Sequence, residues 1–253
     1  MKNHANRYLL GSAAALLILG GCNEDEDAPM APVATTTKAN TTVIDGAIRN
    51  ALVCLDKNAN GKCDTDETQG RTDAAGSVTL DVPNADVGQY AIVAVVGTDA
   101  VDADHGPVTV AYTLAAPADQ TGVVSPLTTL VQQTVATTGT TSAEAARAVQ
   151  DQTGITASLF QDFTKVAAPT DGSINAAAMA RLLVVTTQRQ NVAVASTVGT
   201  PALGGALITQ ADLDKAIQQK LLELLPDLVT ALSNPAVLAA TTPAAKEIGR
   251  AHV

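Results

Sequence analysis

The stretch that decides the β part of the fold reads Ala51-Leu52-Val53-Cys54-Leu55-Asp56-Lys57-Asn58-Ala59-Asn60-Gly61-Lys62-Cys63-Asp64-Thr65-Asp66-Glu67. Its first five residues form an apolar run that is typical of a β-strand. In the polar residues that follow, oxygen-bearing side chains alternate with other residues from Asp56 onward. Gly61 stands in the middle, where a sharp turn suits a residue without a side chain. The pattern predicts a strand that runs into a tight loop lined with oxygen atoms.

Residues 56–67 also match the calcium-binding loop of twelve residues at every position that the ion requires. Calcium takes about six to eight oxygen ligands, and alternating side chains in a tight loop bring such oxygens to one point. The predicted ligands are the side chains of Asp56, Asn58, Asn60, Asp64 and Glu67 and the backbone carbonyl of Lys62. Because a strand precedes the loop, we expect a structural clamp rather than a paired sensor. An acidic turn without metal is the alternative.

Residues 1–21 are expected to be an export signal and no part of the fold. Two basic residues precede an apolar run over residues 9–19, which is too short to span a membrane comfortably. The run ends in Leu19-Gly20-Gly21-Cys22, which resembles the lipobox of bacterial lipoproteins. The resemblance implies a lipoprotein signal peptide and an acylated Cys22, and in a Gram-negative bacterium Asn23 after it favours the outer membrane. An ordinary secretory signal with an incidental cysteine is the alternative.

The two other cysteines bracket the predicted calcium loop. With Cys22 assigned to lipid, Cys54 and Cys63 are left as one pair in an oxidising compartment, which predicts a disulfide between them. Closing a loop of about ten residues would stabilise the fold by roughly 2.5–3 kcal/mol. Two free cysteines are the alternative.

Residues 22–41 are expected to form a lipidated, flexible tether, since an acidic run over 24–27 is followed by prolines and threonines. The whole chain has 15 basic and 25 acidic residues and a formal net charge of −10. This balance argues against a nucleic-acid partner. It also repels anionic lipid, so attachment to a membrane would depend on the acyl chains of Cys22.

Residues 42–118 predict a small antiparallel β-sandwich that contains the loop. Residues 77–82 alternate with period two, and residues 91–96 form a continuous apolar run that suits a strand buried on both faces. A further strand is predicted over residues 108–114, and turn signals such as Asp73-Ala74-Ala75-Gly76 separate the strands.

Residues 119–247 predict a helical domain, so the fold class is α+β. Capping residues mark three helix starts, at Ser125, Thr141 and Thr209, and a long alanine-rich helix is predicted within residues 171–195. A leucine stripe over residues 213–232 is expected to face the core, with a partner-binding face as the alternative. Pro226 within this stripe should kink or end its helix.

Residues 248–253 resemble the translation of a sequencing adapter. They are expected to be an artefactual tail, with the natural protein continuing past Glu247. A natural polar tail is the alternative.

Three segments together resemble a known family: Asp45-Gly46-Ala47-Ile48, residues 53–64 and residues 72–80. They look like the carboxypeptidase-regulatory-like, or transthyretin-like, β-domain and are similar to the B-type domains of Gram-positive adhesins. Residues 124–131 resemble a segment that follows such domains in Gram-negative lipoproteins. The resemblance covers under a third of the chain and implies a folding and interaction module without peptidase activity.

No catalytic residues are predicted, because the sequence holds no nucleophile elbow, zinc-protease helix or phosphate loop. The protein is therefore not expected to be an enzyme. Asp99, Asp102, Asp104 and His105 cluster in the sequence, which suits a second cation, but an exposed acidic turn is favoured.

The sequence thus predicts a lipid-anchored lipoprotein of the cell envelope. In this hypothesis a Ca²⁺-clamped β-domain presents the helical domain to a protein or glycan partner, as in adhesion. The alternative is an envelope enzyme or substrate-binding lipoprotein whose pocket lies in the helical region or beyond residue 247.

Overall fold

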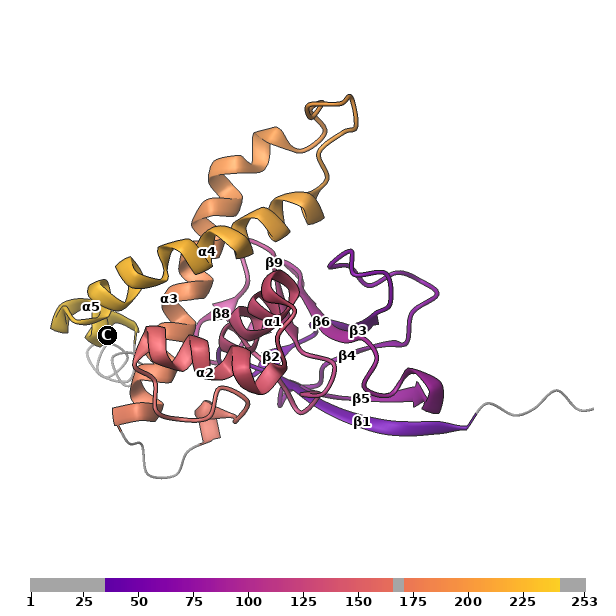
Figure 1. Ribbon diagram of the computed structural model, residues 1–253, viewed down its shortest axis with the longest axis horizontal. Coiled ribbons are helices and arrows are strands. Elements are labelled where there is room, and N and C mark those ends of the chain that lie inside the picture. Colours follow the sequence, from indigo (N-terminus) through magenta and orange to yellow (C-terminus); the bar gives the residue numbers. More distant parts are fainter. Residues whose placement is uncertain (1–34, 166–170, 242–253) are drawn as a thin grey trace, which may run out of the picture. The chain divides into compact units, whose positions relative to one another are not determined.

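The computed structural model describes residues 35–165 and 171–241 (Figure 1). The predicted signal peptide over residues 1–21, lipid attachment at Cys22 and tail over residues 248–253 lie outside these ranges. Strands come first along the chain and helices follow, so the fold class is α+β, as the sequence predicts. The described strands and helices belong to one compact unit.

The described strands form three sheets. The largest is antiparallel, and its order is β4 (Gln69–Arg71), β3 (Leu52–Asp56), β6 (Ala91–Val96) and β9 (Tyr112–Ala116). The second has the order β10 (Val123–Val124), β1 (Thr36–Val43) and β5 (Ser77–Pro83). The third joins β2 (Ile48–Arg49), β7 (Val101–Asp102) and β8 (Gly106–Pro107).

The predicted flexible tether over residues 22–41 is wrong at its end, where the chain forms strand β1. Residues 36–41, predicted as the end of the flexible segment, lie in β1, which pairs with β5 from Thr36 opposite Pro83 to Thr42 opposite Ser77. Threonine is β-branched and packs well in a pleated sheet. The partner strand lies far along the chain, so a polar, threonine-rich run looks like a spacer when it is judged locally. Strand β1 also pairs in parallel with β10, so the sheets are not purely antiparallel.

Strand β9 begins at Tyr112 rather than at residue 108 as predicted. The amide of Gln188 donates a hydrogen bond to the carbonyl of Val110 (3.1 Å), and Asn191 donates to the carbonyl of Ala111 (3.0 Å). Side chains of a helix therefore satisfy backbone groups that a neighbouring strand would otherwise bind.

The β region encloses its own apolar core. Its buried side chains come from all three sheets and include Val43, Ile48, Val53, Leu55, Leu80, Ile92, Ala94, Val96 and Leu114. The run over residues 91–96 forms β6 with Ile92, Val93, Ala94 and Val96 buried, which confirms the predicted strand buried on both faces. Val184 from a helix joins the same core, so helices and sheets pack against each other.

The helices are α1 (Pro126–Thr138), α2 (Ser142–Thr153), α3 (Asp171–Val194), α4 (Gln210–Leu232) and α5 (Pro235–Thr241). The short 3-10 helices are η1 (Asn84–Asp86), η2 (Phe163–Lys165) and η3 (Ala195–Thr197). Capping boxes at Ser125, Thr141 and Thr209 start α1, α2 and α4, which confirms the three predicted helix starts.

The leucine stripe of α4 faces a second apolar core. Ile217, Leu221 and Leu225 are buried there together with residues of α1, α2 and α3, so the core interpretation is confirmed for this face. Pro226 lies inside α4, which continues to Leu232, so the proline does not end the helix. No single described helix is long and apolar enough to cross a membrane; Asp212–Leu232 and Pro235–Thr241 meet that criterion only as a pair bent by 107°.

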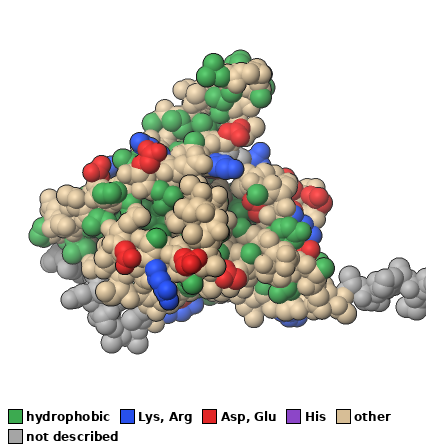
Figure 2. Space-filling view, in the orientation of Figure 1, with side chains coloured by type: hydrophobic (Ala, Val, Ile, Leu, Met, Phe, Trp, Pro, Cys, Tyr) green, Lys and Arg blue, Asp and Glu red, His purple; other side chains and the backbone are tan. Residues whose placement is uncertain are grey.

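Hydrophobic side chains reach the surface where α3 connects to α4. Figure 2 shows such side chains gathered at the tip of this connection. Val198, Leu203 and Leu207 are exposed there, and Leu203 is fully exposed. Nothing in the described residues covers them, which contrasts with the buried stripe of α4.

Candidate functional site

The loop after β3 is closed by a disulfide between Cys54 and Cys63, as the sequence predicts. Cys54 lies in β3 and is fully buried, and its Cα atom is 5.4 Å from that of Cys63. Val93 and Ala115 pack around the bond on the face of the four-stranded sheet. The disulfide therefore joins the middle of the loop to the strand from which the loop begins.

Asp56 anchors the first half of the loop. It ends β3, and its two carboxylate oxygens accept hydrogen bonds from the backbone N–H groups of Asn60 (3.0 Å) and Gly61 (2.8 Å). Gly61 has a φ of +72°, a conformation that glycine adopts without strain. The chain thus wraps around one carboxylate that is only 7% exposed.

Glu67 closes the loop from its other end. Its Oε1 atom accepts a hydrogen bond from the backbone N–H of Lys57 (2.7 Å), and Oε2 accepts one from that of Asp64 (3.0 Å). Glu67 is also 7% exposed. The first and last predicted ligands are therefore buried carboxylates whose oxygens are held by the backbone of the loop itself.

Two other predicted ligands, Asn58 and Asn60, meet at a third, Asp64. The Nδ2 atoms of Asn58 and Asn60 donate hydrogen bonds to Oδ2 of Asp64, at 2.8 and 2.7 Å. These two bonds lower the pKa of the Asp64 carboxyl. The Oδ1 atoms of the same amides accept from the backbone N–H groups of Asn60 and Lys62. Side-chain nitrogens, and not oxygens, thus face the shared carboxylate.

The donor set fits a hard cation in its chemistry, because it supplies carboxylate, amide and carbonyl oxygens. In this structure no three acidic side chains of the described loop bring ligand oxygens within 4.8 Å of one another. Binding calcium would require the amides of Asn58 and Asn60 to rotate, so that oxygen replaces nitrogen on the side of Asp64. Calcium at this loop stays a prediction.

A groove of about 130 Å³ lies beside the loop. Asp56, Asn60 and Gly61 line one side of it, and Gln133 of α1 and Asp214 of α4 line another. Thr113 of β9 donates a hydrogen bond to Asp214 (3.2 Å), whose pKa is raised by burial. The loop therefore lies next to the place where helices α1 and α4 pack on the four-stranded sheet.

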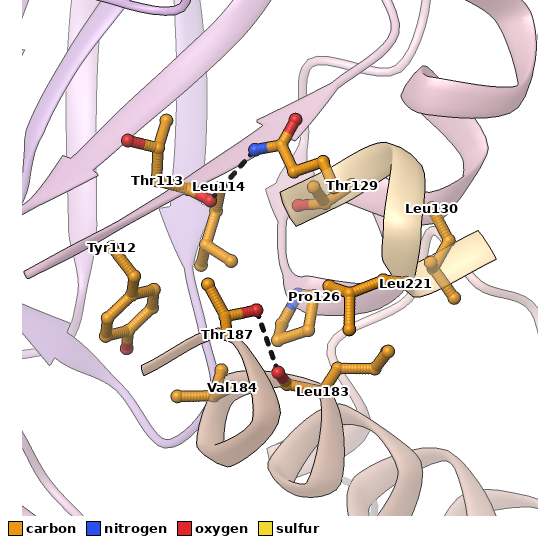
Figure 3. Close-up of a pocket in the computed structure, with 11 residues that line it drawn as sticks. Tyr112, Thr113, Leu114, Pro126, Thr129, Leu130, Leu183, Val184, Thr187 and Leu221 are labelled. Atoms are coloured by element: carbon orange, nitrogen blue, oxygen red, sulfur yellow. Dashed lines mark hydrogen bonds between the residues drawn. The ribbon is translucent and has the colours of Figure 1, made fainter. Parts of the chain in front are cut away.

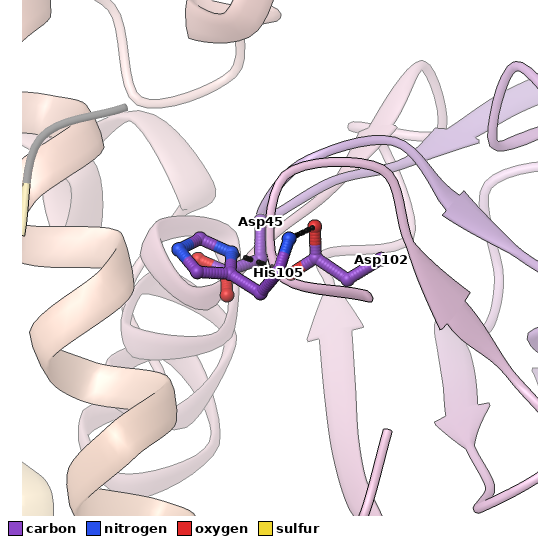
Figure 4. Close-up of side chains that lie close together, drawn as sticks. All are labelled: Asp45, Asp102 and His105. Carbon is purple, nitrogen blue, oxygen red and sulfur yellow. Dashed lines mark hydrogen bonds and ion pairs between the residues drawn. The ribbon is translucent and has the colours of Figure 1, made fainter. Parts of the chain in front are cut away.

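A second cluster of polar side chains lies apart from the loop (Figure 4). Asp45 is in the turn between β1 and β2, Asp102 ends β7, and His105 follows in the turn to β8. One ligand atom from each lies within 4.8 Å of the other two. The sequence favoured an exposed acidic turn here, and for Asp102 that prediction is wrong, since it is 3% exposed.

The close approach of two turns explains the burial of Asp102. A Cβ atom on Gly46 would lie 2.5 Å from Oδ1 of Asp102 and 2.8 Å from Oδ2 of Asp104. Glycine at this position lets the turn after β1 lie against these two carboxylates without displacing them. Asp45-Gly46 and Asp102 lie more than 50 residues apart in the sequence, which carries no local signal of this contact.

Arg181 of α3 joins the cluster from the helical region. Its Nη1 atom lies 3.1 Å from Oδ2 of Asp45. Burial, and next the charge of Asp102, raise the pKa of Asp45 to about 6, although Arg181 opposes the shift. Burial acts to raise the pKa of Asp102, but the hydrogen bonds and charge of His105, together with the backbone hydrogen bond of Asp104, outweigh it and the pKa is lowered. Sequence reasoning missed Arg181, which is 136 residues from Asp45.

An apolar pocket between β9, α1, α3 and α4 is too small for a ligand. Figure 3 shows it lined by side chains that include Tyr112, Leu114, Leu183 and Leu221. Its volume is about 20 Å³, which is room for about one water molecule. We interpret it as a packing gap between the sheet and the helices.

Comparisons of the chain with models of protein families, with curated proteins and with solved structures found no match. The resemblances of residues 19–22 and 45–80 therefore stay predictions that rest on the residues themselves.

Proposed function

We propose that the protein is a lipid-anchored lipoprotein of the cell envelope in which a calcium clamp at residues 56–67 stiffens an interaction module. The observation that carries the proposal is the loop. Its first and last carboxylates, Asp56 and Glu67, are buried, and a disulfide ties its middle to β3. This arrangement holds hard oxygen donors in a preorganised turn, which lowers the entropic cost of gathering them around an ion.

A clamp at this place would act on the helices as well as on the sheet. The loop lines a groove together with residues of α1 and α4, and Gln218 of α4 donates a hydrogen bond to the carbonyl of Thr113 in β9 (3.3 Å). An ion that fixes the loop therefore fixes one wall of the contact between sheet and helices. The proposed role is to hold the helical region in a defined orientation for a protein or glycan partner.

Three cavities among the described residues are smaller than most small-molecule sites, which favours an interaction module at these places. The apolar pocket and the groove beside the loop have volumes of about 20 and 130 Å³, and a cavity lined by Asp102 and His105 has a volume of about 190 Å³. Pockets for small-molecule ligands usually measure about 300–1,000 Å³. The groove beside the loop is lined by several polar side chains and suits a contact with solvent or with a partner surface.

Thermal unfolding in millimolar calcium and in chelator tests the clamp. Calcium at about ten times its dissociation constant adds about 1.4 kcal/mol, which should raise the melting temperature by about 3–6 °C. Glu67→Gln should abolish this shift because it removes one charged ligand oxygen. The matched control is Asp66→Asn, which removes an exposed carboxylate of the same loop outside the predicted ligand set and should keep the shift.

Two results would contradict the clamp: no stabilisation of the unmodified protein by calcium, or equal stabilisation of the Glu67→Gln variant. Magnesium at the same concentration controls for a general effect of divalent charge, since Mg²⁺ demands a smaller and more rigid octahedral site.

A further inference from the structure

We propose that Asp45, Asp102 and His105 form a second metal site, separate from the calcium-type loop, that binds a divalent transition-metal ion such as Zn²⁺. The proposal does not depend on calcium binding at residues 56–67. It places the ion where the turns after β1 and β7 meet helix α3 (Figure 4).

The ligand atoms have the right chemistry and nearly the right spacing. One oxygen of each aspartate and one ring nitrogen of His105 lie within 4.8 Å of one another. Ligands about 2.1 Å from a tetrahedral zinc ion lie about 3.4 Å apart, so shifts on the order of 1 Å would bring the three together. An imidazole nitrogen suits zinc and its neighbours in the periodic table, whereas calcium and magnesium prefer oxygen.

Asp45 holds an oxygen that lacks a partner. Its side chain is fully buried, and Oδ1 has no hydrogen-bond partner, while Oδ2 is 3.1 Å from Nη1 of Arg181. A buried carboxylate oxygen without a donor is destabilising, and proteins rarely leave one in this state. A cation beside Asp102 and His105 would supply the missing interaction.

Hydrogen bonds and an ion pair within the protein also hold the second oxygen of each carboxylate, as is usual around metal ligands. Arg181 fixes Oδ2 of Asp45. The backbone N–H groups of Asp104 (2.7 Å) and His105 (3.1 Å) donate to Oδ1 of Asp102. Oδ2 of Asp102 is then left to face Nδ1 of His105 at 2.8 Å, the contact into which an ion would insert. Each carboxylate thus keeps one oxygen for the protein and one for the ion.

The site has access to solvent through a cavity of about 190 Å³. Asp102 and His105 line it together with Tyr112, Arg181 and Gln188. Three protein ligands and an open side are typical of a zinc site that completes its coordination with water or an exogenous anion. The charge of Arg181 weakens the attraction for a cation, but the two carboxylates outnumber it.

Zinc titration of the untagged, metal-stripped protein tests the site. The titration is followed by competition with a chromophoric chelator, and calcium is present to occupy the loop if it binds there. We expect one tight zinc ion per chain. His105→Gln and Asp45→Asn should each weaken its binding by at least about 100-fold, the upper end of what loss of an outer-shell contact costs.

Two control variants separate this site from other effects. Asp81→Asn removes an exposed carboxylate that pairs with Lys38 and should leave zinc affinity unchanged. Glu67→Gln alters the calcium-type loop and should also leave it unchanged. Cobalt provides a second readout, because its visible absorption depends on its ligands and should change in His105→Gln.

Equal zinc affinity in the unmodified protein and in His105→Gln would overturn the proposal, as would a cobalt spectrum that does not depend on His105. Circular dichroism checks the fold of each variant. If Asp45→Asn does not fold, His105→Gln decides the question, since its side chain is 21% exposed and its replacement leaves the buried aspartates in place.

Discussion

Asp45 offers a quantitative test of how the buried cluster is built. Its pKa is raised from 3.8 to about 6, first by burial and then by the charge of Asp102. This rise in the pKa of Asp45 corresponds to about 3 kcal/mol between the protonated and ionised forms. A raised pKa in the folded state means that the stabilising contribution is complete below pH 4 and is lost as the pH rises through 6.

The effect of Asp45→Asn on the free energy of unfolding should therefore depend on pH. The amide keeps the shape of the protonated carboxyl and does not ionise. The difference between the free energies of unfolding of the variant and the unmodified protein at pH 4 is the reference value. By pH 7 to 8 this difference should move in favour of the variant by up to about 3 kcal/mol. Urea unfolding at pH 4, 5.5 and 7.5, followed by circular dichroism in the presence of chelator, measures the two free energies of unfolding.

The control for this experiment is Asp81→Asn, which removes a carboxylate from an exposed pair with Lys38. It reports what the loss of one surface charge does at each pH. A difference between Asp45→Asn and the unmodified protein that stays constant with pH would refute the argument. A difference of opposite sign would show that the ion pair with Arg181, and not burial, dominates the titration of Asp45.

Three further predictions concern the disulfide, the core of α4 and the membrane anchor. Replacing Cys54 and Cys63 by serine should lower the free energy of unfolding by roughly 2.5–3 kcal/mol and weaken calcium binding; urea unfolding that matches the unmodified protein would contradict the loop-closure argument. Leu221→Ala should cost about 2–5 kcal/mol because Leu221 is buried between helices, whereas the exposed Leu203→Ala should change stability by less than about 0.5 kcal/mol; equal effects would mean that the stripe does not face a core. Cys22→Ala should move the protein from the membrane to the soluble fraction of an expressing bacterium and abolish labelling with palmitate, and retained label would disprove acylation at Cys22.

Local signals predicted much of the fold. The caps at Ser125, Thr141 and Thr209 mark helix starts because their side chains bind backbone N–H groups only a few residues away. The apolar run of β6 needs burial on both faces wherever it lies in the sheet. The pairing of Cys54 with Cys63 follows from a short loop and two available thiols.

Contacts between distant segments explain what the sequence did not reveal. The pairing of β1 with β10 and the position at which β9 begins depend on partners from 78 to 81 residues away. The ion pair of Asp45 with Arg181 depends on the packing of α3 on the sheets, and the close approach of Gly46 to Asp102 depends on the missing side chain of the glycine. Neither relation leaves a periodic or local signal, so only the folded arrangement shows that Asp102 is buried.

The calcium-type loop was predicted from the sequence only in part. Its residue pattern was readable, and the structure shows why the loop turns around Asp56 and closes at Glu67. The residue pattern does not show how the amides of Asn58 and Asn60 are oriented, and so it does not show that their nitrogens face Asp64.

Direct binding of radioactive calcium at equilibrium tests the central claim most directly. The account predicts one ion per chain in the unmodified protein and in Asp66→Asn, with a dissociation constant of roughly 10⁻⁴–10⁻³ M, and no saturable binding in Glu67→Gln. Absence of saturable binding in the unmodified protein, or its persistence in Glu67→Gln, would show that residues 56–67 are a disulfide-braced turn and no metal clamp.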